Sequence, residues 1–200
     1  MTWCQTYSGN ALSFLVPDPD AISIDDIAIG LARECRFARQ TRHFYSVAQH
    51  SVLVAKIVHD QAPGNIGARL RALLHDAHEA FTGDRVTPFM EACDALLPHY
   101  IANPIRTIQH HLDIAICNAL GVEFSAEDRR LVKYADLVAL ATERPQLLRH
   151  HMEWGIDLPP PYPIEIVELD MAAAQFMWRS AFDNTLALYR GVQRPAVAAE

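Results

Sequence analysis

Residues 73–84 read LLHDAHEAFTGD, a run that begins apolar and then becomes dense in ionisable side chains. Two leucines lead directly into His75 and Asp76, and Glu79 follows four residues after the histidine. The apolar spacing predicts a central helix over 68–80, on which residues three or four apart share a face. Because an unpaired ionisable group among apolar neighbours costs free energy, this cluster needs partners or a chemical function.

The sequence on either side of this helix predicts further helices. Ser23 with Asp26, and Ser125 with Asp128, have the spacing of capping boxes, in which two side chains satisfy backbone N–H groups at a helix start. Helical periodicity and turn signals place the remaining helices at 25–34, 46–59, 105–120, 125–142, from Pro145 towards Trp154, and at 170–189.

Two segments between these helices indicate irregular structure. The first 20 residues end in the turn signal PDPD, and residues 82–88 read TGDRVTP, which is typical of a loop. No pair of segments combines strand alternation with the turn chemistry of a β-hairpin. The expected fold class is therefore all-α.

Length and composition favour one domain with a buried core. The chain has 200 residues, half of them hydrophobic, and a chain of this length most often forms a single domain. We place the domain at 1–190 and expect a flexible tail at 191–200. The net charge is −7 and no lysine or arginine cluster occurs, which argues against a nucleic-acid polymer as partner. A few arginines still suffice for a small anionic ligand.

Several further features indicate a cytoplasmic protein. No apolar run reaches the roughly 18 residues that suggest a membrane span, so we expect no membrane partner. The N-terminal residues MTWCQTYSGN lack the basic and apolar regions of a secretory signal. The four cysteines are scattered without zinc-site spacing, which suits free thiols in a reducing compartment.

The histidine and carboxylate of the central stretch predict a metal site. One imidazole and one carboxylate suit a borderline divalent cation, but His75 and Asp76 provide only two ligands. His50 and Asp136, each on an expected helix among apolar neighbours, are the natural candidates for the others. Taken alone, each has a more common explanation, which is a hydrogen-bonded core histidine for His50 and a surface acid or helix cap for Asp136.

Four segments in order resemble one enzyme family. They are CRF (35–37), YSVAQHS (45–51), LLHDAHEAFTGD (73–84) and VKYADLVALATE (132–143). Together they resemble the HD-domain metal-dependent phosphohydrolases, and within them the small 5′-deoxynucleotidases and the phage-type dATP triphosphohydrolases. The resemblance covers roughly residues 1–145 and implies a helical core of about five helices, with extra C-terminal helices.

The resemblance implies a role for each ionisable residue of the motifs. Position by position, the metal ligands would be His50, His75, Asp76 and Asp136. The cofactor would be a divalent metal such as Zn, Co or Mn, with Mg as a further candidate that accompanies the nucleotide. Glu79 and Asp84 match two acids that do not bind the metal, one serving the attacking water and the other the leaving oxygen. The alternatives are that Glu79 orients His75 and that Asp84 is a turn residue.

Three further residues match substrate contacts of the family. Arg36 matches an arginine that meets the nucleotide phosphates, and Phe37 matches an aromatic residue, often tryptophan, beside the base or sugar. Lys133 lies three residues before Asp136, and a phosphate contact is reasonable for it. The alternatives are ordinary surface positions for Arg36 and Lys133. Glu143, seven residues after Asp136, reads as structural.

The resemblance implies hydrolysis of deoxynucleotides. The substrate is a small molecule, either a deoxynucleoside monophosphate or a triphosphate, above all dATP, and the motifs leave both open. One alternative is a catalytically inactive protein that senses a metal and a nucleotide, and another is a phosphodiesterase on the same scaffold. We also expect a homo-oligomer, with an interface supplied by the apolar residues of the last helix, which are Phe176, Met177, Trp178, Phe182 and Leu186. The alternative for this helix is packing on the core.

Overall fold

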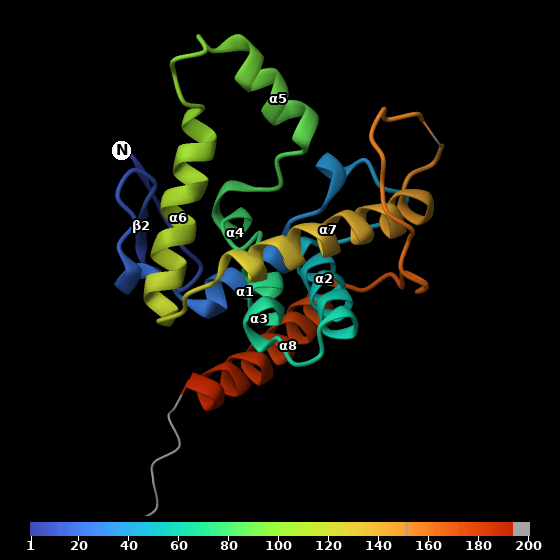
Figure 1. Cartoon of the computed structure of the whole chain (residues 1–200). Helices are drawn as coiled ribbons and strands as arrows, with labels where there is room; N and C mark the ends of the chain where they lie inside the picture. Colours follow the sequence, from blue (N-terminus) through green and yellow to red (C-terminus); the bar gives the residue numbers. More distant parts are fainter. Residues whose placement is uncertain (151, 194–200) are drawn as a thin grey trace, which may run out of the picture.

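The computed structural model describes residues 1–150 and 152–193, and helices dominate it (Figure 1). The predicted all-α fold class is confirmed, since a two-stranded antiparallel pair is the only sheet in these ranges. Within the same ranges, no helix combines the length and the apolar character that crossing a bilayer requires. The expected tail at 191–200 falls mostly outside the described residues, and 191–193 form the end of the last helix.

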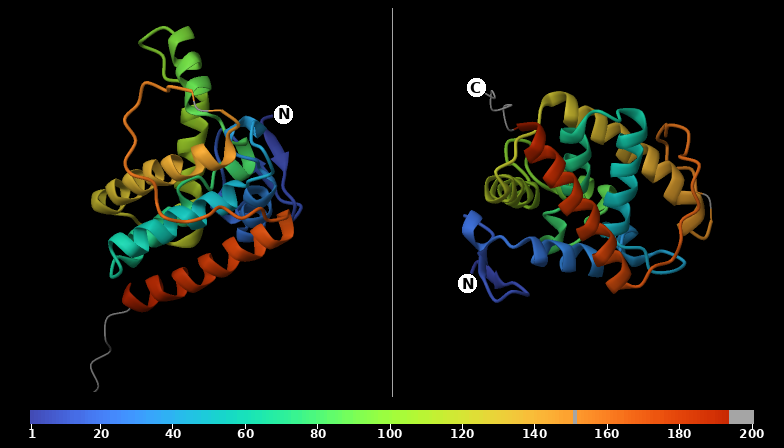
Figure 2. Two further views of the ribbon diagram at one scale, coloured as in Figure 1. Left: turned by 90° about the vertical axis from the view of Figure 1, so that its right-hand side faces the viewer. Right: turned by 90° about the horizontal axis from the view of Figure 1, so that it is seen from below.

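Four helices form the centre of the molecule. α2 and α3 lie side by side between α7 on one side and α8 on the other (Figure 2). α1 packs against α2, α4 and α8. The helices are α1 (Ile24–Arg33), α2 (Val47–Gln61), α3 (Ile66–Leu74), α4 (Glu79–Thr82), α5 (Thr87–Leu96), α6 (Pro104–Leu120), α7 (Ala126–Leu147) and α8 (Met171–Gln193), with 3₁₀ turns at Pro19–Ala21 and Phe37–Arg39.

The predicted central helix is interrupted where the ionisable residues begin. α3 ends at Leu74, and a short helix, α4, starts only at Glu79. Between them the backbone tightens to bonds three residues apart, from Ala77 N to Leu74 O (3.1 Å) and from Glu79 N to Asp76 O (2.9 Å). The expectation of one continuous helix over 68–80 was therefore wrong, because such three-residue bonds turn the chain more tightly than an α-helix does.

A close approach between α1 and α4 accompanies this interruption. Gly30 of α1 lies against Ala80 of α4, and a β-carbon at Gly30 would stand 2.7 Å from the Ala80 β-carbon. No side chain fits in that space, so glycine permits the two helices to touch. This contact holds α4 on α1 and away from the axis of α3.

The two predicted capping boxes differ in outcome. At α7 the box is complete, with Asp128 N donating to Ser125 Oγ and Ser125 N donating to Asp128 Oδ2. At α1, Ser23 accepts from the backbone of the second helical residue, but Asp26 does not reciprocate. Asp26 instead accepts from the backbone and the hydroxyl of Ser8, at 2.7 and 2.6 Å. The expected box at Ser23 is therefore only half formed, because a long-range partner takes the carboxylate.

The first 20 residues are more ordered than the sequence predicts. β1 (Trp3–Gln5) pairs with β2 (Ala11–Ser13) in an antiparallel hairpin. The chain reverses through a turn in which Gly9 adopts a φ of 92° and donates to Thr6 O. The Ser8–Asp26 hydrogen bonds tie this turn to α1 and so stabilise the hairpin. Short-range sequence patterns do not predict such a contact, because the two residues lie far apart in the sequence.

Two further helical segments depart from expectation. The predicted loop at 82–88 leads into α5, which starts at Thr87 with Pro88 in its first turn. Pro145 does not begin a new helix, because α7 continues through it to Leu147. The side chains of Thr142 and Leu147 are almost fully buried, so packing on the core holds the last turns of α7 in place despite the proline.

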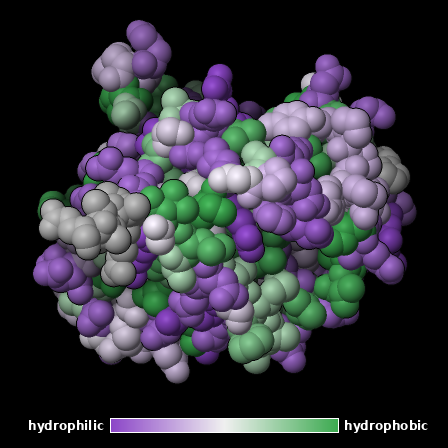
Figure 3. All heavy atoms as spheres, turned by 60° about the horizontal axis from the view of Figure 1, so that its bottom comes forward, coloured by the Kyte–Doolittle hydropathy of each residue, from purple (hydrophilic) through white to green (hydrophobic). Residues whose placement is uncertain are grey.

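The apolar face of α8 belongs to the core of one chain. Trp178 is fully buried, stacks on Phe182 with ring centroids 5.1 Å apart, and donates its indole N–H to Leu73 O at 3.1 Å. Leu186 is also buried, whereas Phe176 is 75% exposed. Figure 3 shows apolar surface on this side of the molecule in separate patches among polar residues. Three of the five proposed interface residues thus pack internally, and self-association stays a prediction.

Trp178 offers a test of this packing. We expect Trp178→Ala to lower the free energy of unfolding by about 3–5 kcal/mol, since it removes a buried indole and leaves a cavity. Phe176→Ala, on the exposed face of the same helix, should change it by less than about 0.5 kcal/mol. Urea unfolding followed by circular dichroism measures both. Equal effects of the two substitutions would contradict the assignment of the buried face.

Candidate metal centre

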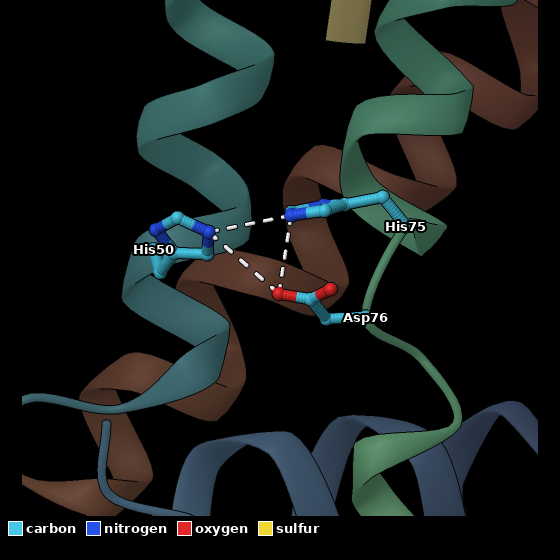
Figure 4. A group of neighbouring side chains, drawn as sticks. All are labelled: His50, His75 and Asp76. Carbon is cyan, nitrogen blue, oxygen red and sulfur yellow. Dashed lines mark hydrogen bonds and ion pairs between the residues drawn. The ribbon is translucent and has the colours of Figure 1, made fainter. Parts of the chain in front are cut away.

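Three side chains meet as one group, His50, His75 and Asp76, and a fourth, Asp136, stands outside the group and contacts His50. His50 comes from α2, His75 and Asp76 from the turn after α3, and Asp136 from α7. Figure 4 shows His50, His75 and Asp76 pointing towards one another. His50 Nε2 lies 3.3 Å from His75 Nε2 and 3.7 Å from Asp76 Oδ2, and His75 Nε2 lies 3.1 Å from Asp76 Oδ2. Asp136 Oδ1 lies 3.4 Å from His50 Nε2.

Hydrogen bonds orient both imidazoles. The Nδ1 of His75 lies 2.7 Å from the carbonyl oxygen of Ala72, and the Nδ1 of His50 lies 2.6 Å from Glu143 Oε1. Both partners accept hydrogen bonds, so each Nδ1 donates and each Nε2 faces the centre. An imidazole held in this way by a carbonyl or a carboxylate is the usual arrangement of a histidine that binds a metal. His50, His75 and Asp76 form a group that could hold a metal ion.

The charges around the cluster favour a positive group at its centre. Burial and the Arg36 charge oppose protonation of His50, but the Glu143 and Asp136 carboxylates outweigh them and raise the His50 pKa to about 9. Burial likewise opposes ionisation of Asp76, yet His75, His50 and Arg36 hold its pKa well below the usual range. The cluster thus combines ionised oxygens with oriented nitrogens, which are the donors that a borderline divalent cation prefers.

Glu143 is the site residue that sequence reasoning undervalued. Its side chain is fully buried, and its carboxylate accepts from His50 Nδ1, from Tyr45 Oη at 3.0 Å and from Arg36 Nε at 3.2 Å. Burial opposes its ionisation, but Arg36 and His50 lower its pKa. The available signal was its position seven residues after Asp136, because two helical turns place both residues on one face.

Arg36 lies inside the cluster and not on the surface. Its side chain is 12% exposed, and its guanidinium lies 3.2 Å from Glu143 Oε2 and 3.8 Å from Asp76 Oδ2. The same guanidinium stands over the Phe37 ring, 5.3 Å from its centroid. Lys133, by contrast, is 71% exposed and pairs with Asp136 Oδ2 at 3.2 Å. The structure therefore places Arg36 beside the candidate metal centre, whereas Lys133 contacts this centre from the surface, through Asp136.

Two acids beside the cluster hold protons readily. Glu79 is buried, and within the described residues its Oε2 has no hydrogen-bonding partner. Burial, followed by the charges of Asp76 and Asp84, raises the pKa of Glu79 well above its usual value. Burial and the charge of Asp76 also raise the pKa of Asp84, although Arg36 opposes this. The Asp84 N–H donates to Glu34 Oε1 at 3.2 Å. This hydrogen bond holds Asp84 in place directly after Gly83, where α4 ends.

Removing one carboxylate tests the metal centre. We expect the wild-type chain to retain a divalent metal and Asp76→Ala to lose it, because a metal site that has lost a ligand binds far more weakly. Elemental analysis after dialysis measures the metal content. The matched control is Asp157→Ala, at an exposed aspartate outside the cluster, which should retain the wild-type amount. A full equivalent of metal in Asp76→Ala would refute the site.

The buried carboxylate behind His50 allows a finer test. We expect Glu143→Ala to weaken metal affinity by about 10- to 100-fold, since His50 loses the partner that orients its ring. Glu143→Gln can still accept from His50 Nδ1 and should lose less. A competition titration with a chromogenic chelator measures the affinity, with exposed Glu127→Ala as the control. If both Glu143 variants bound metal like the wild type, the positioning role would be wrong.

Two bacterial proteins are similar to this chain over most of their length. The uncharacterized protein YfdR of Escherichia coli is 37% identical over 147 residues, which cover 74% of this chain and 73% of YfdR. The uncharacterized protein RCAP_rcc00048 of Rhodobacter capsulatus is 37% identical over 151 residues, or 72% of each chain. No family model matches the sequence. At this identity and coverage, the chain belongs to the same family as YfdR and RCAP_rcc00048.

Proposed function

We propose that this protein is a metal-dependent phosphohydrolase of deoxynucleotides. The observation that carries the proposal is the convergence of His50, His75, Asp76 and Asp136 beside a buried carboxyl, Glu79, whose Oε2 has no partner among the described residues. A bound metal ion and a neighbouring acid both assist the hydrolysis of a phosphate ester or anhydride. The choice of deoxynucleotides rests on the resemblance of the four sequence segments to HD-domain phosphohydrolases.

The four converging residues would hold the metal. Two imidazole nitrogens and two carboxylate oxygens suit Zn, Co or Mn, and Mg is a further candidate that accompanies the nucleotide. When bound, such a cation polarises a phosphoryl oxygen and lowers the pKa of water. The protein contributes the orientation of the two histidines, through hydrogen bonds to Ala72 O and Glu143.

The two acids would carry the protons of the reaction. Attack of water oxygen on phosphorus releases a proton and leaves the departing oxygen in need of one. Glu79 and Asp84 both have raised pKa values, and a group whose pKa is close to the working pH transfers protons most efficiently. Between them, the two carboxyls accept the proton of the attacking water and supply one to the leaving oxygen.

The cationic residues would bind the phosphate. Arg36 stands 3.8 Å from Asp76 and is held by Glu143, so its remaining N–H groups are pre-oriented beside the metal ligands. Arginine suits this role because its planar donors match phosphate oxygens. Lys133, exposed beside Asp136, can meet a phosphate that enters from solvent, and the Phe37 ring next to Arg36 can meet the sugar or base.

The proposal extends to location and assembly. We place the enzyme in the cytoplasm, where its cysteines, which are free within the described residues, would stay reduced. We also propose self-association. Size-exclusion chromatography with light scattering measures the mass in solution, and a mass of one chain across the working concentrations would reject the oligomer.

A product assay tests the activity. Protein stripped with chelator is reloaded separately with Mn, Co, Zn or Mg and given each of the four deoxynucleoside monophosphates and triphosphates. We expect release of inorganic phosphate from the former or of triphosphate from the latter. Asp76→Ala should release neither, and Asp157→Ala should match the wild type. Binding of metal and nucleotide without turnover in any metal would reject the enzyme and identify a sensor.

Glu79 separates metal binding from proton transfer. We expect Glu79→Gln to retain the metal, since it is not among the converging ligands, and to lose about 100-fold or more in kcat. Elemental analysis and the product assay measure the two properties on the same sample. Exposed Glu127→Gln is the matched control and should keep both. A wild-type kcat for Glu79→Gln would remove Glu79 from the chemistry.

A further inference from the structure

A cavity adjoins the segment between α1 and α2. It has a volume of about 440 Å³ and lies between the end of α1, the residues that follow it, and the first residue of α8. Its polar lining consists of Arg33, Arg39, Thr41 and His43, together with one carboxylate, Glu34, and one thiol, Cys35. None of these residues belongs to the metal centre, whose arginine is Arg36.

The cavity presents hydrogen-bond donors that the protein leaves available. The Nε2 of His43 is buried, and among residues 1–150 and 152–193 it has no hydrogen-bonding partner. The Arg39 side chain is 72% exposed and has one distant carboxylate neighbour, Glu34, at 3.9 Å. Arg33 places the face of its guanidinium 5.6 Å from the Tyr7 ring centroid, which leaves its N–H edges for a ligand.

The backbone separates the two arginines of this segment. Phe37, Ala38 and Arg39 all have positive φ values, of 54°, 50° and 66°, a conformation that non-glycine residues rarely adopt. Arg36, just before this turn, enters the metal centre, whereas Arg39, at its end, lines the cavity. Such strain is kept where the surrounding structure or a function requires it.

Glu34 connects the cavity to the metal centre. Its Oε1 accepts the N–H of Asp84 at 3.2 Å and lies 3.9 Å from Arg39 Nη1. The negative charge of Glu34 is therefore engaged by two donors. An anion that draws Arg39 away would leave the Glu34 carboxylate with the Asp84 N–H as its remaining donor.

We propose that this cavity binds a phosphate group, at a site separate from the metal centre. Two arginines and the Thr41 hydroxyl supply donors that phosphate oxygens accept, against one carboxylate in the lining, Glu34. Phe44 and Met171 add an apolar wall, against which the organic part of a phosphate ester can lie. The phosphate comes either as free inorganic phosphate or as part of a nucleotide. The site does not depend on the hydrolysis proposed above.

Direct binding measurements test the site without using activity. The full-length chain, both as purified and after chelator treatment, is titrated calorimetrically with inorganic phosphate. We expect binding in both samples, weakened at least fivefold by Arg39→Gln and by Arg33→Gln and unchanged by Arg129→Gln, at an exposed arginine of α7. No binding after chelation, or wild-type binding by both cavity variants, would overturn the proposal.

Imidazole signals locate the phosphate independently of these variants. In ¹H–¹⁵N spectra of the chelated protein, phosphate should shift the ring signals of His43, identified by their loss in His43→Gln, and leave those of His50 and His75 in place. Shifts confined to His50 and His75 would overturn the proposal. A parallel titration with dAMP identifies the source, since tighter binding than phosphate supports a nucleotide and equal binding supports free phosphate. Retained phosphate binding with no hydrolytic activity would reject only the enzyme.

Discussion

The buried carboxylate of Glu143 joins the helical core to the candidate metal centre. It accepts from His50, Tyr45 and Arg36, which come from α2 and the segment before it. A fully buried carboxylate is tolerated only when charges and hydrogen bonds compensate for the lost water. These three partners provide that compensation, and in return each is held in one orientation. The orientations of the imidazole and of the guanidinium therefore depend on one side chain, which also links α2 to α7.

The interruption between α3 and α4 positions His75 and Asp76, the other two members of the candidate metal centre. A continuous α-helix would advance about 100° between His75 and Asp76. In the tight turn that replaces it, the two side chains reach one point, with His75 Nε2 3.1 Å from Asp76 Oδ2. α4 then packs on α1 at Gly30 and Ala80, which buries Glu79. Thus the same interruption of the helix brings His75 and Asp76 together and accompanies the burial of Glu79.

Arg36, in the segment that follows α1, forms ion pairs with carboxylates at the candidate metal centre. Asp76, Asp136 and Glu143 all have pKa values below the usual range, so the region carries several negative charges, with Arg36 and His50 as the positive partners within it. Glu79 and Asp84 have raised pKa values because further ionisation there meets burial and like charge. A divalent cation would reduce that repulsion. Arg36 and Arg39, three residues apart, face two different environments because the backbone between them turns through positive φ values.

Local chemistry was enough to predict the helical class and most helix positions. It singled out His75, Asp76 and Glu79, whereas His50 and Asp136 were only candidates until the resemblance of the four segments implied that they are ligands. Capping at Ser125, helical periodicity, and the spacing of His75, Asp76 and Glu79 are short-range properties that a sequence states directly. Tertiary structure alone decided what depends on contacts between distant segments. It interrupted the predicted helix over 68–80 and placed Trp178 in the core. It also paired the Asp26 carboxylate with Ser8 instead of with the start of its own helix. It also made Glu143 the hydrogen-bonding partner of His50. The partners of a buried charge depend on how α2 and α7 pack, and no local sequence pattern encodes the distance between these two helices.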